Sequence, residues 1–359
     1  MRLKAGVVGG TGMVGQRFIT LLENHPWFEV TAVAASANSA GKSYEEAVNG
    51  KWKLSLPVPE TIKRITVQDA SRVEDVTSGV DLIFCAVDMN KDEIRALEEA
   101  YARTGTPVIS NNSAHRWTPD VPMVIPEVNP GHIEVIASQR KRLGTKTGFI
   151  AVKPNCSIQS YVPTLHAVME YKPLKVVACT YQAISGAGKT FRDWPEMIDN
   201  VIPYIRGEEE KSEQEPLRIW GSISGGAIVK AAGPLITTQC IRIPVSDGHL
   251  AAVFVTFEKK PSKDEILERW RSFRGRPQEL VLPSAPKQFI RYFEEDDRPQ
   301  TKLERDAESG MGITAGRLRE DALYDYKFVC LSHNTVRGAA GGGVLIAELL
   351  KAEGYIQKK

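Results

Sequence analysis

One cysteine of this 359-residue chain stands where a thiol could act as a nucleophile. Cys156 follows an apolar run at 149–152 that is broken by Pro154 and Asn155, and a helix-like stretch begins at Ser157. Amides at a helix N-terminus stabilise a thiolate and lower the pKa of the thiol. We therefore predict a reactive Cys156. The other cysteines lie in apolar, strand-like runs and are expected to be buried and inert: Cys85, Cys179, Cys240 and Cys330.

A nucleophilic thiol needs an acid/base group, and histidine titrates in the useful range. Of six histidines, His249 follows a glycine turn between two predicted strands, and Arg242 precedes it by seven residues. This pair could present an acid/base and a carboxylate-binding guanidinium together. A histidine on an exposed hairpin is the alternative, and the presence of Cys156 is what favours catalysis.

The N-terminus carries the pattern of a dinucleotide site. An apolar run ending at Val8 leads into Gly10-x-Gly12-x-x-Gly15 and then a helical pattern. Glycines at this spacing allow a tight turn and close approach to a pyrophosphate at the helix N-terminus. A purely steric role for the glycines is the alternative. Their place in the first βαβ unit favours a nucleotide.

The second predicted strand bears on which dinucleotide is bound. An NAD site usually has an acid about 20 residues beyond the glycines, whereas here no acid follows the strand until Glu45. Ser36, Ser39 and Lys42 offer hydroxyls and a cation suited to a 2′-phosphate. We predict NADP as the cofactor, with weaker use of NAD, and a polar surface loop is the alternative for these residues.

The elements that position these residues form two regions. Over the first 150 residues short apolar runs alternate with helical patterns, as in a Rossmann-like parallel sheet of the α/β class. The expected strands are 4–8, 29–35, 82–86 and 108–110, and the expected helices are 13–23, 91–103 and 130–142. From Phe149 longer strands (176–184, 236–245, 250–258, 326–331) predict an α+β domain with a charged loop at 207–215 and a helical tail at 344–353.

Composition is that of an ordinary globular protein. The chain has 46 Lys+Arg against 44 Asp+Glu, a net charge of +2, which argues against a general nucleic-acid or membrane-surface binder. It has no apolar stretch of membrane-spanning length and no signal-peptide pattern, so we expect a cytoplasmic protein. The scattered cysteines lack metal-ligand spacing, so no metal is expected.

Several motifs in one order give the chain a family resemblance over essentially its whole length. They are GGTGMVG at 9–15, SNNSAHR at 110–116, PNCS at 154–157, TYQAISGAG at 180–188, GEEEK at 207–211, the segment 242–249 and NTVRGAA at 334–340. In these the sequence resembles aspartate-semialdehyde dehydrogenase of the archaeal and fungal branch.

The resemblance implies a glyceraldehyde-3-phosphate dehydrogenase-like architecture. Residues 1–152 would form the NADP-binding Rossmann domain, completed by the C-terminal helix within 334–359, and 153–333 the catalytic and dimerisation domain. The implied reaction is the reversible NADP-dependent reductive dephosphorylation of L-4-aspartyl phosphate to L-aspartate 4-semialdehyde, in lysine, threonine, methionine and isoleucine biosynthesis. A homodimer or homotetramer is implied, and Tyr161 and Tyr204 are candidate subunit contacts.

The resemblance also implies roles for single residues. Cys156 would form the thioester, His249 would be the acid/base and Gln182 would orient substrate and thiol. Arg242 would bind the α-carboxylate. One glutamate of 208–210, taken as Glu208, would bind the ammonium group. The phosphate would contact Lys211 and Arg116, and Asn155 would help to stabilise the tetrahedral oxyanion. The cofactor would contact Gly10, Thr11, Gly12, Met13, Val14, Gly15, Ser185, Gly186 and Asn334.

Three other functions remain open from sequence. Acyl-phosphate reductases for glyceraldehyde 3-phosphate or N-acetylglutamyl phosphate rank last, because they carry other residues around the nucleophile than the segment PNCSIQ at 154–159. A malonyl-CoA or other acyl-thioester reductase would share the scaffold, nucleophile and cofactor, but it would not need the ammonium-binding glutamate. A noncatalytic nucleotide sensor would need the glycine turn but not Cys156. The acyl-thioester reductase and the sensor both differ from a phosphorylating aldehyde dehydrogenase in not requiring phosphate.

Overall fold

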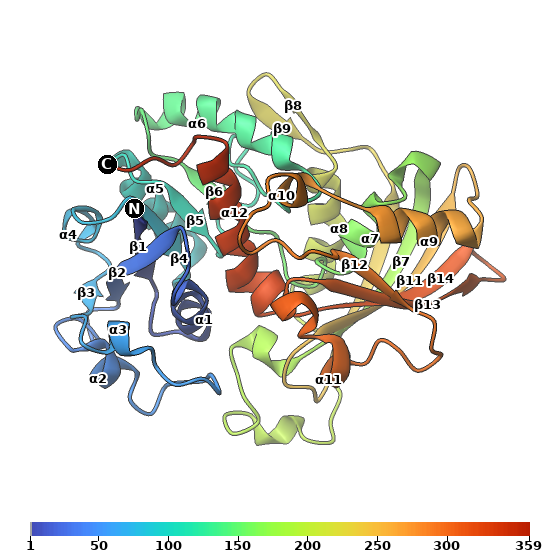
Figure 1. Cartoon of the computed structure of the whole chain (residues 1–359), viewed down its shortest axis with the longest axis horizontal. Helices are drawn as coiled ribbons and strands as arrows, with labels where there is room; N and C mark the ends of the chain where they lie inside the picture. The colour runs from blue at the N-terminus through green and yellow to red at the C-terminus, as the bar shows by residue number, and fades with distance from the viewer. Residues whose placement is uncertain (1) are drawn as a thin grey trace.

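Two six-stranded sheets dominate the computed structural model, which describes residues 2–359 (Figure 1). The first sheet has the order β3-β2-β1-β4-β5-β6, and all its paired strands are parallel. Its strands are β1 (Leu3–Val8), β2 (Phe28–Ala35), β3 (Gln68–Asp69), β4 (Leu82–Cys85), β5 (Val108–Ser110) and β6 (Ile150–Val152). The Rossmann-like α/β prediction is thereby confirmed.

Helices connect these strands as the alternating pattern predicts. They are α1 (Met13–Leu22), α2 (Tyr44–Val48), α3 (Glu60–Lys63), α4 (Val73–Thr77), α5 (Lys91–Arg103) and α6 (Ile136–Leu143). α5 begins at the Asn90 cap, whose side chain accepts from the amides of Asp92 and Glu93. The helix expected over 130–142 is divided, because Pro130–Val135 is a 3₁₀ helix that precedes α6.

The second sheet is mixed and has the order β10-β7-β11-β14-β13-β12. Its strands are β7 (Pro173–Gln182), β10 (Leu235–Arg242), β11 (His249–Phe257), β12 (Ile290–Phe293), β13 (Ile313–Glu320) and β14 (Tyr326–Ser332), and a hairpin of β8 (Ser222–Ser224) and β9 (Ala227–Val229) stands apart. The accompanying helices are α7 (Tyr161–His166), α8 (Glu208–Ile219), α9 (Lys263–Ser272), α10 (Arg276–Glu279) and α11 (Thr301–Glu304).

One face of this second sheet is apolar and only half-buried. Along β7 and β11 every second residue is buried, and the alternate residues, which point to the opposite face, are partly exposed. These include Val177, Cys179, Tyr181, Leu250 and Phe254. Cys179 is therefore not the buried thiol that we expected, whereas Cys85, Cys240 and Cys330 are fully buried.

The last helix joins the two regions. α12 (Gly341–Ala352) lies between the sheets in Figure 1, and its residues 341–350 are all buried. It packs on α1 and β5 of the first region, as the helical tail was expected to do. The boundary at residue 152 stays a prediction, although the two sheets are drawn from 3–152 and 173–332. No helix among residues 2–359 is long and apolar enough to cross a membrane.

Candidate active site

The glycine turn between β1 and α1 has the close packing that its sequence predicts. Gly9 has φ +81°, and a Cβ there would lie 2.3 Å from the Ala86 carbonyl oxygen. A Cβ on Gly15 would lie 2.2 Å from the Gly9 oxygen. Any larger residue at position 15 would therefore prevent α1 from packing this closely against the turn. No side chain caps the N-terminus of α1 at Gly12, which leaves its first amides available to an anion.

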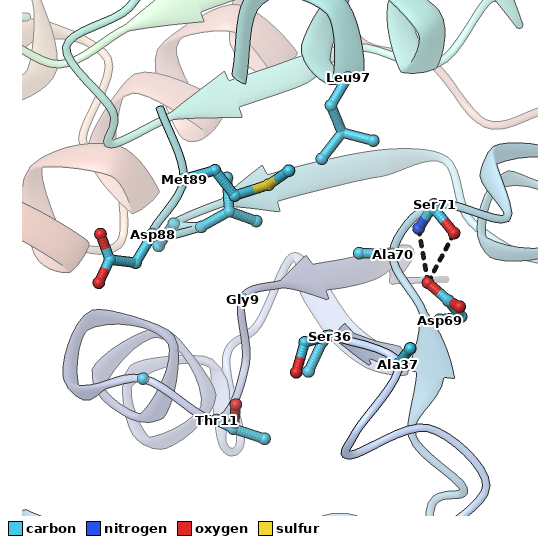
Figure 2. Close-up of a pocket in the computed structure, with 14 residues that line it drawn as sticks. Gly9, Thr11, Ser36, Ala37, Asp69, Ala70, Ser71, Asp88, Met89 and Leu97 are labelled. Atoms are coloured by element: carbon cyan, nitrogen blue, oxygen red, sulfur yellow. Dashed lines mark hydrogen bonds between the residues drawn. The ribbon is translucent and has the colours of Figure 1, made fainter. Parts of the chain in front are cut away.

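A cavity of about 480 Å³ opens beside this turn, at the carboxyl ends of the parallel strands. Thr11 lies at one side of it, Ser36 and Ala37 follow β2, and Met89 and Leu97 form the opposite apolar wall (Figure 2). This is where a dinucleotide binds in an open parallel sheet. A donor-rich helix N-terminus beside an apolar wall fits a pyrophosphate and an adenine.

The polar end of this cavity differs in part from the prediction. Ser36 lines it, but Ser39 is buried, and the Lys42 ammonium donates to the Asn38 carbonyl oxygen at 3.0 Å. Asp69 also lines the cavity and accepts from the amide and hydroxyl of Ser71 (Figure 2). Asp69 was missed because it belongs to a strand of only two residues, β3, which no hydrophobic pattern marks.

A second cavity, of about 250 Å³, contains the predicted nucleophile. It is lined by nine of the predicted site residues: Val14, Arg116, Asn155, Cys156, Ser185, Gly186, Glu208, Lys211 and Asn334. Thr11 and Gly12 line the first cavity and Val14 lines the second, so the start of α1 borders both. A cofactor in the first cavity could therefore reach a substrate in the second.

Cys156 does not stand at a helix N-terminus. Residues 157–160 form turns, and α7 begins only at Tyr161 and has six residues. The thiol instead donates to the Asn155 side-chain oxygen at 3.3 Å. Burial and the Glu208 carboxylate raise the pKa of the thiol above its ordinary value, against the opposing charges of Lys153, Arg116 and Arg242. The predicted cause of a low pKa is thus wrong.

The predicted charged loop at 207–215 is also wrong, because this segment is the start of α8. Gly207 turns the chain with φ +71°. Four polar residues at helical spacing, Glu208, Lys211, Ser212 and Glu215, then lie on one face. That spacing was visible in the sequence, but the run of three glutamates suggested a solvated loop.

Among the three glutamates, only Glu208 lines the cavity. Its carboxylate accepts from the Asn155 amide group at 3.0 Å and from the Lys211 ammonium at 2.8 Å. Although burial acts to raise it, Lys211 and Asn155 hold the pKa of Glu208 below its ordinary value. Glu209 faces β10 instead and accepts from the Cys240 amide at 3.3 Å, and Glu210 is exposed. These positions support Glu208 as the ligand-binding glutamate.

Glu215 is a buried carboxylate that our sequence analysis missed. It accepts from the Arg116 guanidinium at 2.8 Å and from the backbone amide of Asn155 at 2.6 Å. Arg116 also donates through Nε to the Lys153 carbonyl oxygen at 3.1 Å. Glu215 therefore ties the predicted phosphate contact Arg116 to the residue that precedes the nucleophile.

His249 and Arg242 lie together behind Gly186, a lining residue of the cavity. A Cβ on Gly186 would be 2.9 Å from Arg242 Nη1 and 3.1 Å from His249 Nε2. His249 Nδ1 accepts from the Ala183 amide at 3.1 Å, so the ring proton is on Nε2, which is buried without a hydrogen-bond partner. Burial and repulsion from Arg242 lower the pKa of His249 to about 3, so the imidazole is neutral at neutral pH.

Of the two remaining predicted residues, Gln182 does not line the second cavity, whereas Asn334 forms part of its wall. The Gln182 side chain is buried and donates to the Thr180 hydroxyl at 3.2 Å, outside the lining of the cavity. Asn334 donates to the Ser185 hydroxyl at 2.8 Å and accepts from the Gly248 amide at 2.8 Å, which links the chain end to the cavity wall.

The loop at 110–113 is fixed by a buried carboxylate. Glu98 of α5 accepts from the Ser110 hydroxyl at 2.5 Å and the Asn112 amide group at 2.8 Å. The neighbouring residues Asn111 and Ser113 line the substrate cavity. Burial raises the pKa of Glu98 to about 7, although both donors act to lower it. Within the described chain, no group of three His, Cys, Asp or Glu side chains could hold a metal ion.

Known proteins share this arrangement of elements and motifs. Residues 4–136 match the family described as semialdehyde dehydrogenase, NAD binding domain, and residues 165–337 match the one described as semialdehyde dehydrogenase, dimerisation domain. The aspartate-semialdehyde dehydrogenase of Methanothermobacter thermautotrophicus is 43% identical over 97% of this chain and 99% of its own, and that of Aspergillus fumigatus is 40% identical over 98% of each. The crystal structure of aspartate semialdehyde dehydrogenase with NADP from Candida albicans superposes with a TM-score of 0.89 at 40% identity, over 99% of this chain and all of the other.

Proposed function

Since the chain belongs to the aspartate-semialdehyde dehydrogenase family, we propose that it catalyses the reversible NADP-dependent reductive dephosphorylation of L-4-aspartyl phosphate to L-aspartate 4-semialdehyde. The observation that carries this proposal is the content of one cavity. It combines a thiol, Cys156, with a carboxylate, Glu208, and two cations, Arg116 and Lys211. A substrate with an ammonium group and a phosphate, attacked at an acyl carbon, needs these groups.

The protein's own groups account for the first step. The Cys156 thiolate attacks the acyl carbon of aspartyl phosphate, a C–S bond forms, and phosphate leaves with the bonding pair to give a thioester. Arg116 and Lys211 bind the departing phosphate. Arg242 binds the α-carboxylate and Glu208 the ammonium group, which hold the acyl carbon near the thiol.

The thioester is then reduced and released. NADP, whose pyrophosphate would bind at Gly12 and the start of α1, supplies a hydride as NADPH. The tetrahedral oxyanion of the thiohemiacetal would accept a hydrogen bond, for which the Nε2–H of His249 is a donor. Breaking the C–S bond returns the thiolate and gives the aldehyde. Asn155, which also lines the cavity, would be a second donor to this oxygen.

The open face of the second sheet supports a homo-oligomer. Its half-buried apolar residues, such as Val177, Leu250 and Phe254, form a surface of the kind that is buried between subunits. Tyr161 was expected as a contact but is fully buried, and its hydroxyl donates to the Ser212 carbonyl oxygen. Tyr204 is exposed. We propose a homodimer formed through this face. A homotetramer would consist of two such dimers.

We also propose that the enzyme works in the cytoplasm. Its five cysteines, Cys156 among them, are free thiols, as is usual in a reducing compartment. A nucleophilic thiol would be kept active there.

An activity assay tests the function. In one reaction the purified protein is given aspartate semialdehyde, phosphate and NADP, and the formation of NADPH is measured. In a parallel reaction it is given malonyl-CoA and NADPH, and the consumption of NADPH is measured. We expect phosphate-dependent turnover with the semialdehyde that is lost in Cys156→Ala. Turnover of malonyl-CoA alone would instead support the acyl-thioester reductase, which the named relatives do not favour. Nucleotide binding without any turnover would support the sensor.

A further inference from the structure

A third cation faces the substrate cavity, and it differs from the other two in its partners. Arg116 pairs with Glu215 and Lys211 with Glu208, each at 2.8 Å. Lys153 also lines the cavity, yet over residues 2–359 no carboxylate lies within ion-pair distance of its ammonium group. Its Nζ donates only to the Pro154 carbonyl oxygen. The charge of Lys153 is therefore not neutralised by the protein.

Lys153 is held firmly in this place. It follows β6, its amide donates to the Ser110 carbonyl oxygen at 3.0 Å, and its own carbonyl oxygen accepts from Arg116 Nε at 3.1 Å. The residue is only 2% exposed. A buried lysine without an anionic partner carries a large desolvation cost, so a ligand or reacting group of negative charge would stabilise it.

The C-terminal segment covers Lys153 and Cys156 together. A Cβ on Gly342 would lie 3.2 Å from Lys153 Cδ, and a Cβ on Gly338, four residues earlier, would lie 2.8 Å from Cys156 Cβ. These two glycines let the turn at Val336–Ala340 and the start of α12 approach the two side chains. Lys153 and Cys156 thus share one small, covered space.

The thiolate of Cys156 needs a source of positive charge. The helix that could have supplied it begins five residues away, at Tyr161, and has fewer than two full turns. Burial and Glu208 both act against the thiolate. Of the cavity's cations, Arg116 and Lys211 are already paired with carboxylates.

We propose that Lys153 is a positioning residue for the nucleophile: its ammonium group stabilises the Cys156 thiolate in the covered space between β6 and α12. This inference deepens the proposed function, because it concerns the same thiol. When Lys153 is a neutral amine, the proton of the thiol passes to Nζ. The result is a thiolate and an ammonium ion with the same total charge.

Titration of both groups agrees with such a pair. Burial, and then repulsion from Arg116, lowers the pKa of Lys153 to about 7, and the charge of Cys156 opposes that shift. Lys153 is also the foremost of the cations that oppose the raised pKa of Cys156. The other charged or titratable groups around the two side chains are Glu208, Lys211, Glu215, Arg242, His249 and Arg337.

The test measures the thiol itself, without substrate or cofactor. The full-length protein is alkylated with iodoacetamide between pH 5 and 10, and modification of the Cys156 peptide is quantified by mass spectrometry. In Lys153→Met we expect the midpoint of the pH profile to rise by about 1 unit, which lowers alkylation at pH 7 by about tenfold. Lys153→Arg keeps the charge and should restore most of the rate.

Two controls keep the result interpretable. Lys259→Met removes an equal charge from an exposed position on the second domain and should leave the midpoint unchanged. Far-UV circular dichroism and the unfolding midpoint show whether each variant is folded. An unchanged profile in folded Lys153→Met, or equal shifts in Lys153→Met and Lys153→Arg, would overturn the inference. This experiment measures no turnover, so neither result bears on the proposed reaction, which the activity assay tests separately.

Discussion

Replacement of Glu215 should weaken both the fold and the site. This carboxylate is fully buried and has two partners, the Arg116 guanidinium at 2.8 Å and the Asn155 amide at 2.6 Å. In Glu215→Ala the guanidinium is left buried beside a small apolar side chain. The amide that precedes Cys156 loses its acceptor at the same time.

The expected cost follows from these two losses. Breaking a buried ion pair by removing one partner costs about 3–5 kcal/mol, against a total stability of about 5–15 kcal/mol for a typical domain. Glu215→Gln keeps an oxygen that can accept from Asn155 but no charge for Arg116, so about half of that cost should remain. Displacement of Cys156 by as little as ~1 Å could lower turnover by ~10²-fold.

Urea denaturation followed by tryptophan fluorescence measures the free energy of unfolding, and NADPH formation measures turnover. Glu210→Ala is the matched control, because Glu210 lies on the same helix and is exposed; a change within about 0.5 kcal/mol is expected there. If Glu215→Ala were no less stable than Glu210→Ala, the buried pair would not be holding the segment before Cys156.

Three further predictions concern the site and its surroundings. His249→Ala should lower turnover by about 10²–10⁴-fold with the fold intact, because the Nε2 proton donor is lost; steady-state kinetics with unchanged turnover would remove His249 from the reaction. Gly186→Ala should lower turnover more than stability, because its Cβ would lie 2.9 Å from Arg242 Nη1 and 3.1 Å from His249 Nε2; a fully active variant would show that these side chains can move. The pKa of Glu98 is raised to about 7 in the folded protein, so folding favours the protonated carboxyl. The stability that this carboxyl contributes is therefore present at low pH and is lost as the pH rises towards 7. The free energies of unfolding measured with urea at pH 5 and at pH 8 should therefore differ less in Glu98→Gln than in the unchanged protein, by up to about 3 kcal/mol, and equal pH dependence in both would contradict the assignment.

Much of the first region could be predicted because hydrophobic period and glycine spacing are local signals. The strand at 108–110 and the helix at 91–103 match β5 and α5 to the residue. The turn at Gly10–Gly15 and its place after β1 also follow from the sequence. β3 could not be predicted in this way, since two residues carry no period.

The site was predictable in its residue types but not in its contacts. Lys153 and Glu215 lie 62 positions apart, and their meeting around Arg116 depends on how α8, which packs on β10, places Glu215 near the segment after β6. The environment of Cys156 was mispredicted for a related reason. A helix start was inferred from composition after Asn155, whereas the chain makes turns up to residue 160 before α7 begins.

The buried C-terminal helix has a consequence for how the protein is made. Gly338 and Gly342 complete the surroundings of Cys156 and Lys153, yet they follow these residues in the chain by 182 and 189 positions. The first sheet can form early on the ribosome, as domains that emerge first usually do, but Cys156, which follows its last strand, remains uncovered until residues 338–342 have emerged and folded. A truncated product that stops before residue 336 would expose this thiol and the apolar surface that α12 covers, so it would be inactive and prone to aggregation or proteolysis.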